Sequence, residues 1–164
     1  MSHARPLDKG EHNDYVVFML PPFTATGSLP PGVHNASWDE FEKRFGGSPR
    51  REVLLQGLLE AATNLRAAGV RVLWLGGSFV TDKEEPNDWD GVWDPSNADL
   101  TKVDPVFIDQ ADLAAGRYRQ KTKYGGELLV GIETATGMPF QLFFQLDKNG
   151  DPKGIVRLDL RTLP

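Results

Sequence analysis

The feature that most constrains the fold of this chain is a run of β-branched, aromatic and aliphatic residues at positions 70–75 that stands between glycines. Gly69 precedes the run, and Gly76 and Gly77 follow it. β-branched and aromatic residues favour strands, whereas glycines interrupt regular structure on either side. The run therefore predicts a central strand, which other parts of the chain must cover.

The residues upstream predict the helices that cover this strand. Ser37 and Glu40 have the spacing of a capping box, which predicts a helix over 38–45. Ser48-Pro49 is a second helix start, because serine caps a helix and proline suits its first turn. Apolar residues recur at helical spacing from there to the next glycine, and we expect this stripe to pack on the sheet. The stripe consists of Val53, Leu54, Leu58, Ala61, Ala62 and Leu65.

Further strands and a third helix are predicted downstream. Residues 89–93 predict a second strand, and residues 109–124 predict a helix with a cationic end. The cations of that end are Arg117, Arg119, Lys121 and Lys123. Residues 138–146 and 154–160 predict two strands, and the turn-forming residues between them indicate a hairpin. This order predicts an α+β domain with a mixed β-sheet and helices packed on one face.

The length of 164 residues favours one domain with one hydrophobic core. Residues 1–27 are predicted to form an N-terminal tail and an extended leader, in which residues 15–20 have the composition of a short strand. Residues 28–164 are predicted to form the folded domain.

Composition excludes several classes of function. The chain has 0 cysteines, which excludes disulfides, thiolate nucleophiles and cysteine-based zinc sites. Its net charge of -5 argues against a general polyanion binder, because phosphate affinity depends on a cationic surface. No stretch approaches the roughly 18 consecutive apolar residues of a membrane span, and the N-terminus lacks the pattern of a secretory signal. We therefore expect a cytoplasmic protein without a membrane partner.

Asp88-Trp89-Asp90 is the strongest candidate for chemistry. Residues two apart in a strand point to the same face, so the two carboxylates are expected to aim together while Trp89 packs into the core. Mg²⁺ prefers hard oxygen ligands and retains several waters, so two aspartates and substrate phosphates suffice for a partial site. Asp88 and Asp90 are therefore predicted to be metal-ligating and catalytic residues.

A phosphate-binding turn is predicted upstream of this pair. Gly77-Ser78 lies where the first strand ends, and glycine lets backbone amides approach a phosphate that a side chain would block. The Ser78 hydroxyl adds a donor. Lys83, in the acidic loop that follows, is a further candidate for a triphosphate contact, although charged runs of this kind are usually solvated loop tips.

Gly77-Ser78 followed by Asp88-Trp89-Asp90 on the next strand resembles the signature of the DNA polymerase beta superfamily of nucleotidyltransferases. The loop of residues 79–87 has a length that this superfamily tolerates. The resemblance implies a nucleotidyltransferase-like domain over 28–164 with Mg²⁺ or Mn²⁺ as cofactor.

A wider resemblance covers roughly residues 20–164. Its motifs look like those of a family of small bacterial and phage proteins, largely of unknown function, that have a nucleotidyltransferase-like core. They are Leu29-Pro30-Pro31-Gly32-Val33-His34, Trp38-Asp39-Glu40-Phe41, Gly77-Ser78-Phe79-Val80-Thr81, Asn87-Asp88-Trp89-Asp90-Gly91 and Lys153-Gly154-Ile155-Val156-Arg157.

The chain departs from the superfamily pattern at the third carboxylate. Active members usually carry it on a later strand, where it completes the metal site. The natural place here is the strand predicted at 139–145, which contains no acid. Possible substitutes for the third carboxylate are Glu127, Glu133, Asp147 and Asp159, and no sequence pattern favours one of them.

These observations lead to two main hypotheses. The first is a Mg²⁺-dependent nucleotidyltransferase that moves a nucleoside monophosphate from a nucleoside triphosphate to a hydroxyl of RNA, such as tRNA, or of protein. Resemblance to small proteins of this kind suggests a toxin-antitoxin or phage-defence system. The second is a catalytically degenerate module, for example an antitoxin, that binds a nucleotide or a partner protein without turnover. A phosphohydrolase is a third, weaker option.

The cationic helix end is predicted either to be exposed or to contact a nucleotide or RNA backbone.

Overall fold

The computed structural model describes residues 19–131, 133 and 135–164, so most of the strand predicted at 15–20 lies outside the described residues. The elements, in chain order, are β1 (Gly32–Ala36), α1 (Trp38–Phe45), α2 (Pro49–Ala67), β2 (Val72–Gly76), the 3-10 helix η2 (Ser78–Val80), β3 (Trp89–Val92), η3 (Pro105–Phe107), α3 (Gln110–Ala114), α4 (Tyr118–Tyr124), β4 (Gly126–Leu129), α5 (Phe140–Phe143), β5 (Gly154–Asp159) and η4 (Leu160–Thr162).

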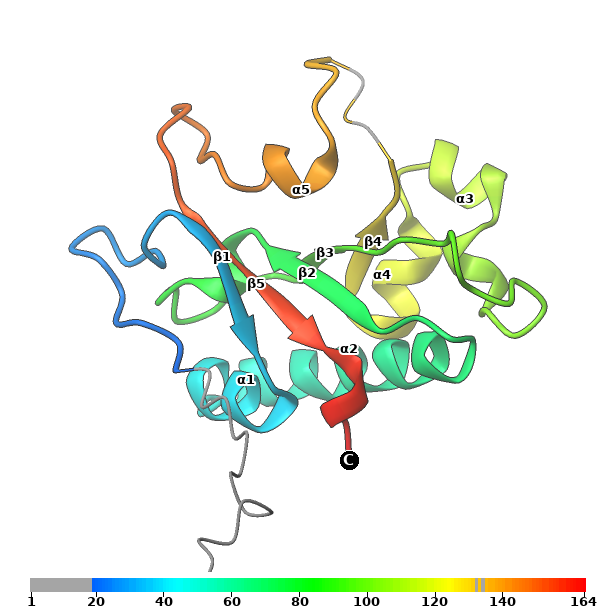
Figure 1. The fold of residues 1–164 in the computed structure, drawn as a ribbon, viewed down its shortest axis with the longest axis horizontal. Helices are drawn as coiled ribbons and strands as arrows, with labels where there is room; N and C mark the ends of the chain where they lie inside the picture. The colour runs from blue at the N-terminus through cyan, green and yellow to red at the C-terminus, as the bar shows by residue number, and fades with distance from the viewer. Residues whose placement is uncertain (1–18, 132, 134) are drawn as a thin grey trace, which may run out of the picture.

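The strands form one mixed sheet in the order β1-β5-β2-β3-β4 (Figure 1). β1 is parallel to β5, and β3 is parallel to β4. β2 lies at the centre and is antiparallel to both of its neighbours, β5 and β3. The predicted α+β class with a mixed sheet is therefore confirmed, and the run at 70–75 does supply the central strand.

The hydrophobic core lies between one face of the sheet and helices α1 and α2 (Figure 1). Leu73 and Leu75 of β2 are buried in this core. Because side chains alternate along a strand, Trp74 and Gly76 face the opposite side. A Cβ on Gly76 would lie 2.8 Å from the Cβ of Phe144, which follows α5. The short α5 segment therefore packs on the face opposite α1 and α2.

Both predicted helix starts are confirmed. Ser37 caps α1 by accepting a hydrogen bond from the Glu40 amide at 3.2 Å, and Ser48 caps α2 by accepting one from the Arg51 amide at 3.1 Å. Glu40 does not complete the capping box, because its carboxylate instead accepts from the backbone amide of Leu20 at 2.7 Å. This contact attaches the start of the described chain to α1.

The prediction of a strand at 138–146 is wrong, and of the hairpin with 154–160 only the turn and one antiparallel bridge, between Leu146 and Pro152, are present. The segment contains helix α5, and β5 pairs with β1 and β2 instead. Three phenylalanines explain the difference, because residues spaced by three and four lie on one face of a helix. Phe140, Phe143 and Phe144 contact one another with ring centroids between 5.8 and 6.3 Å apart.

The helix predicted at 109–124 is broken into α3 and α4. Gly116 and Arg117 at the break have φ angles of 81° and 62°, a left-handed conformation that cannot continue an α-helix.

Strands β1 and β4 were not predicted. β4 begins directly at Gly126, whose preceding glycine ends α4 with a left-handed C-cap.

Candidate functional site

Strand directions bring several polar residues to one end of the sheet. β2 ends at Gly76, and both of its antiparallel neighbours, β3 and β5, begin at that same end. Asp88 directly precedes β3, and Lys153 directly precedes β5. β4 runs parallel to β3 and so begins there too. The Gly77-Ser78 turn, which leaves β2, therefore lies among the first residues of three other strands.

The turn at Gly77 lies directly against the carboxylate of Asp90. Gly76 and Asp90 are register partners across β2 and β3. Gly77 has a φ of 68°, and a Cβ placed on it would lie 2.4 Å from Oδ2 of Asp90. Only glycine combines this conformation with this approach. The Ser78 hydroxyl has no hydrogen-bond partner among the described residues, which leaves it available to a ligand.

Asp88 and Asp90 act on one another electrostatically. The pKa of Asp90 is raised to about 7, mainly because burial disfavours the charged carboxylate, and then because of the negative charges of Asp88 and Glu127. Trp89 between them is fully buried and donates its indole N–H to the carbonyl of Tyr124 at 3.0 Å. The predicted burial of Trp89 is confirmed, whereas Asp88 precedes β3, so the shared direction of the two carboxylates stays a prediction.

A third carboxylate, Glu127, lies on β4 beside Asp90. The two residues are register partners in the parallel ladder, so their side chains share one face of the sheet. A hydrogen bond between the two carboxyl groups also raises the pKa of Asp90. Arg117 and Lys121 lie 3.7 and 3.9 Å from the Glu127 carboxylate. The sequence feature that could have identified this strand is the short apolar run Leu128-Leu129-Val130, which follows the helix-ending glycines Gly125 and Gly126.

The other acids considered from the sequence are engaged elsewhere. Glu133 accepts from the amides of Ala135 and Thr136, and Asp147 accepts from those of Asn149 and Asp151. Both therefore stabilise their own local turns.

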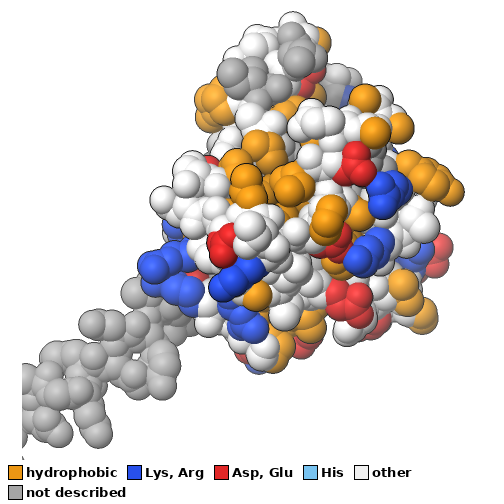
Figure 2. Space-filling view, turned by 90° about the vertical axis from the view of Figure 1, so that its right-hand side faces the viewer, with side chains coloured by type: hydrophobic (Ala, Val, Ile, Leu, Met, Phe, Trp, Pro, Cys, Tyr) orange, Lys and Arg blue, Asp and Glu red, His pale blue; other side chains and the backbone are white. Residues whose placement is uncertain are grey.

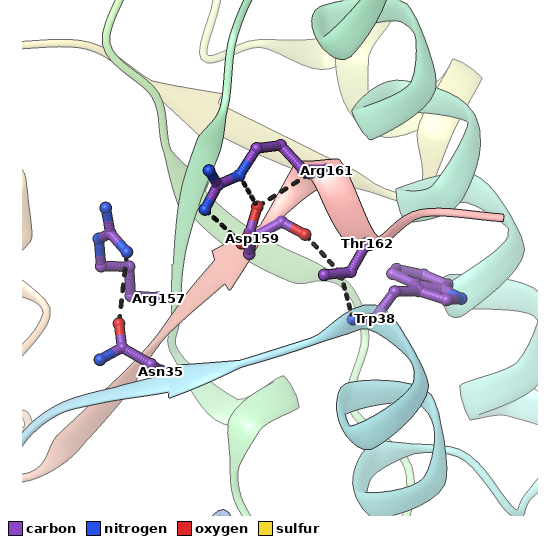
Figure 3. Close-up of polar contacts among 6 residues, drawn as sticks. All are labelled: Asn35, Trp38, Arg157, Asp159, Arg161 and Thr162. Carbon is purple, nitrogen blue, oxygen red and sulfur yellow. Dashed lines mark hydrogen bonds and ion pairs between the residues drawn. The ribbon is translucent and has the colours of Figure 1, made fainter. Parts of the chain in front are cut away.

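Asp159 lies at the far end of β5. Figure 3 shows it binding the Arg161 side chain there, with an Oδ2 to Nη2 distance of 2.9 Å. The six residues of β5 separate Asp159 from Lys153 by about 20 Å. Asp159 is thus at the opposite end of the sheet from the Gly77-Ser78 turn.

The carboxylate oxygens of Asp88, Asp90 and Glu127 are the type of ligand atom that divalent cations bind. They offer the hard oxygen ligands that Mg²⁺ prefers, and a bound cation would offset both the burial and the neighbouring negative charges that raise the pKa of Asp90. Among the residues that the structure describes, no three His, Cys, Asp or Glu side chains are grouped closely enough to hold a metal ion. The assignment of a metal ion to Asp88 and Asp90 therefore stays a prediction, in which water and phosphate would supply the remaining ligands.

The four cations of the α4 region are paired with acids. Lys123 and Arg119 lie 2.5 and 2.7 Å from carboxylate oxygens of Asp104 and Asp109 respectively. Arg117 and Lys121 pair with Glu127, as described above. Figure 2, which views the molecule from this side, shows basic and acidic side chains intermixed with apolar ones. The pairing favours a structural role over a clamp for an RNA backbone.

Lys83 is held in place by its backbone, while its side chain is exposed. The buried guanidinium of Arg51 donates to the carbonyl of Lys83 at 2.6 Å, and also to those of Phe79, Thr81 and Phe45 at 2.8 to 3.0 Å. Arg51 thereby fixes the chain between the Gly77-Ser78 turn and the carboxylates. Sequence reasoning did not identify this positioning residue.

A cavity of about 550 Å³ opens beside Asp88, between α2 and α4. Arg50, Gln56 and Glu60 of α2 line one side, and Lys121 of α4 lines the other. Lys121 therefore contacts both the cavity and Glu127. The cavity provides space for a ligand that extends away from the carboxylates.

None of the helices in the described part of the chain is both long enough and apolar enough to cross a membrane. No curated protein and no solved structure matches the chain. Residues 21–159, which include the Gly77-Ser78 turn and all three carboxylates, match the family described as "Family of unknown function (DUF6932)", and the chain therefore belongs to that family.

Proposed function

We propose that this protein is a Mg²⁺-dependent nucleotidyltransferase, which moves a nucleoside monophosphate from a nucleoside triphosphate to a hydroxyl of RNA or protein. The observation that carries the proposal is the approach of Gly77 to the Asp90 carboxylate, with a built Cβ only 2.4 Å from Oδ2. A turn that can bind phosphate and an acid that can bind metal are therefore in direct contact. Nucleotidyl transfer needs such positioning more than it needs covalent chemistry.

Each residue has a separate role in this proposal. Asp88 and Asp90 hold Mg²⁺, which supplies charge neutralisation at the phosphates when bound. Gly77 and Ser78 hold the outgoing phosphates through a backbone amide and a hydroxyl. Glu127, one strand away from Asp90, supplies the third carboxylate and orients the attacking hydroxyl. The absence of an acid from residues 139–145 no longer argues against catalysis, because that segment is not the neighbouring strand.

The cavity lined by Asp88 gives the nucleoside a place at one member of the metal-binding pair, although Asp90 and the Gly77-Ser78 turn do not line it. By analogy with other small proteins that have this signature, we assign the protein to a cytoplasmic toxin-antitoxin or phage-defence system. A neighbouring protein or an RNA then provides the acceptor hydroxyl.

One observation favours the rival function of a nucleotide-binding or partner-binding module without turnover. Glu127 is already within 4 Å of two cations, Arg117 and Lys121, which supply the positive charge that a metal would otherwise bring. If these pairs persist when nucleotide binds, Glu127 does not orient an acceptor. The protein then binds its ligand and does not transform it.

Incubation with α-³²P-labelled nucleoside triphosphates, Mg²⁺, total RNA and a protein extract distinguishes these functions. The transferase predicts label in RNA or protein, lost with EDTA and reduced by roughly 100-fold or more in Asp88→Asn. Asp94→Asn is the matched control, because Asp94 is an exposed acid beyond the other end of β3. That variant is expected to keep wild-type incorporation.

Each other outcome points to a different function. Nucleotide binding without incorporation supports the module, and release of free phosphate supports hydrolysis. Incorporation that persists unchanged in Asp88→Asn would show that the proposed metal pair is not the catalytic site.

A further inference from the structure

Lys153 occupies the side of the Gly77-Ser78 turn that faces away from β3. It directly precedes β5, and β5 is the second antiparallel neighbour of β2. The register pairs Leu75 with Val156, so the residues before β5 lie next to the residues that follow β2. The turn is therefore flanked by Asp88 on one side and by Lys153 on the other.

The Lys153 side chain is half-buried, yet its ammonium group has no hydrogen bond or ion pair with the residues that the structure describes. Its backbone is fixed, because its amide donates to the carbonyl of Gln145 at 2.8 Å. Burial lowers the pKa of Lys153, and the negative charges of Asp147 and Asp90 oppose this shift only in part. A half-buried cation without a contacting partner is costly, and an anionic ligand removes that cost.

The other cations near the turn are less suited to bind an anion. Lys121 and Arg117 are engaged with Glu127. The Lys83 side chain is exposed, and the contact with Arg51 fixes only the backbone carbonyl of Lys83. Of the lysines near the site, Lys153 thus combines a fixed backbone, partial burial and an ammonium group that has no hydrogen bond or ion pair with a described residue.

We propose that Lys153, and not Lys83, binds the terminal phosphates of a nucleoside triphosphate seated on the Gly77-Ser78 turn. This assignment rests on the proposed function, and it requires the ligand of the Gly77-Ser78 turn to carry a chain of phosphates. Phosphates on the turn lie between the metal-binding pair at Asp88 and Asp90 and the ammonium group of Lys153. A lysine is a compact point charge, which suits a terminal phosphate that carries most of the negative charge.

The test is calorimetric titration of the full chain with ATP and with inorganic tripolyphosphate, each with Mg²⁺. Lys153→Met is expected to weaken both ligands by roughly tenfold or more, since it removes one charge-assisted contact to phosphate. Lys148→Met is the matched control, because Lys148 is exposed in the turn that leads to β5. Lys148→Met and Lys83→Met are both expected to bind within about twofold of wild type.

Thermal unfolding separates a ligand-binding role from a structural one. Without ligand, Lys153→Met is expected to unfold at the same temperature as wild type or above it, because it removes a half-buried charge. With tripolyphosphate, the wild-type transition is expected to rise and the variant transition to rise much less.

Two results would overturn the assignment in different ways. If wild-type protein binds neither ATP nor tripolyphosphate, the proposed function fails and the role of Lys153 fails with it. If wild type binds both and Lys153→Met binds them equally well, or if Lys83→Met alone loses binding, only the assignment to Lys153 fails.

Discussion

Gly77 is the residue whose identity matters most to the site, because it combines a left-handed backbone with a direct approach to Asp90. We predict that Gly77→Ala costs about 1 kcal/mol of stability from the strained φ and also displaces the Asp90 carboxylate. Gly150→Ala is the control, because Gly150 has a φ of 81° with nothing within 4 Å of the added Cβ. Urea denaturation measures the first effect, and label incorporation measures the second.

Similar stability losses in both variants, with loss of nucleotidyl transfer in Gly77→Ala alone, would support the contact between turn and carboxylate. Equal transfer activity in the two variants would show that nucleotidyl transfer does not require the Asp90 carboxylate to lie against Gly77.

The approach of the Gly77 turn to Asp90 was predictable from the sequence because the signal was local, whereas the roles of these residues stay predictions. Gly77, Ser78, Asp88 and Asp90 stand close together in the chain and carry a recognisable order of residue types. Glu127 and Lys153 are distant in the sequence and reach the site only through strand pairing. The residue pattern around Glu127 does not predict that β4 pairs with β3, and the pattern around Lys153 does not predict that β5 pairs with β2.

Among the elements, the loop from η2 to β3 is held by two side chains of α2. Arg50 donates to the carbonyls of Pro86 and Asn87. Arg51 holds the part nearer η2. Arg51 donates five hydrogen bonds to four carbonyl groups and lies over the ring of Phe79, with Cζ 4.9 Å from the ring centroid. We predict that Arg51→Met destabilises the fold by about 3 kcal/mol, because buried carbonyls lose their donors. Denaturation in urea measures this loss.

Arg66→Met serves as the comparison, because the Arg66 side chain makes one hydrogen bond, to the carbonyl of Leu163. It is expected to cost about 1 kcal/mol. Equal losses in the two variants would mean that the Arg51 network does not hold the loop.

Elements were predictable where the local signal agreed with the tertiary context. Helices α1 and α2 begin at the predicted serine caps, and the run at 70–75 supplies four of the five residues of β2, which ends one residue later, at Gly76. α5 was misread because an aromatic run favours a strand by propensity, whereas its ring contacts and the packing of Phe144 on Gly76 require a helix. β4 is only four residues long and follows a strong helix stop, which hid it.

For the molecule as a whole, the sheet order explains why chemistry gathers at one end. Because β2 is antiparallel to both β3 and β5, its C-terminal turn meets the starts of both neighbouring strands. The parallel partner β4 brings Glu127 to the same end. The family match over residues 21–159 includes all of these strands, so the candidate site and the sheet that positions it lie within one matched region.

Binding of Mn²⁺, followed by electron paramagnetic resonance in the presence of ATP, tests the central claim most directly. The account predicts binding by wild type that strengthens from pH 6 to pH 8, because the pKa of Asp90 is raised to about 7 and its proton must leave before metal binds. Below that pKa, affinity is expected to fall by roughly tenfold per pH unit. Asp90→Asn is expected to bind weakly at every pH, and unchanged Mn²⁺ affinity in that variant would contradict the account.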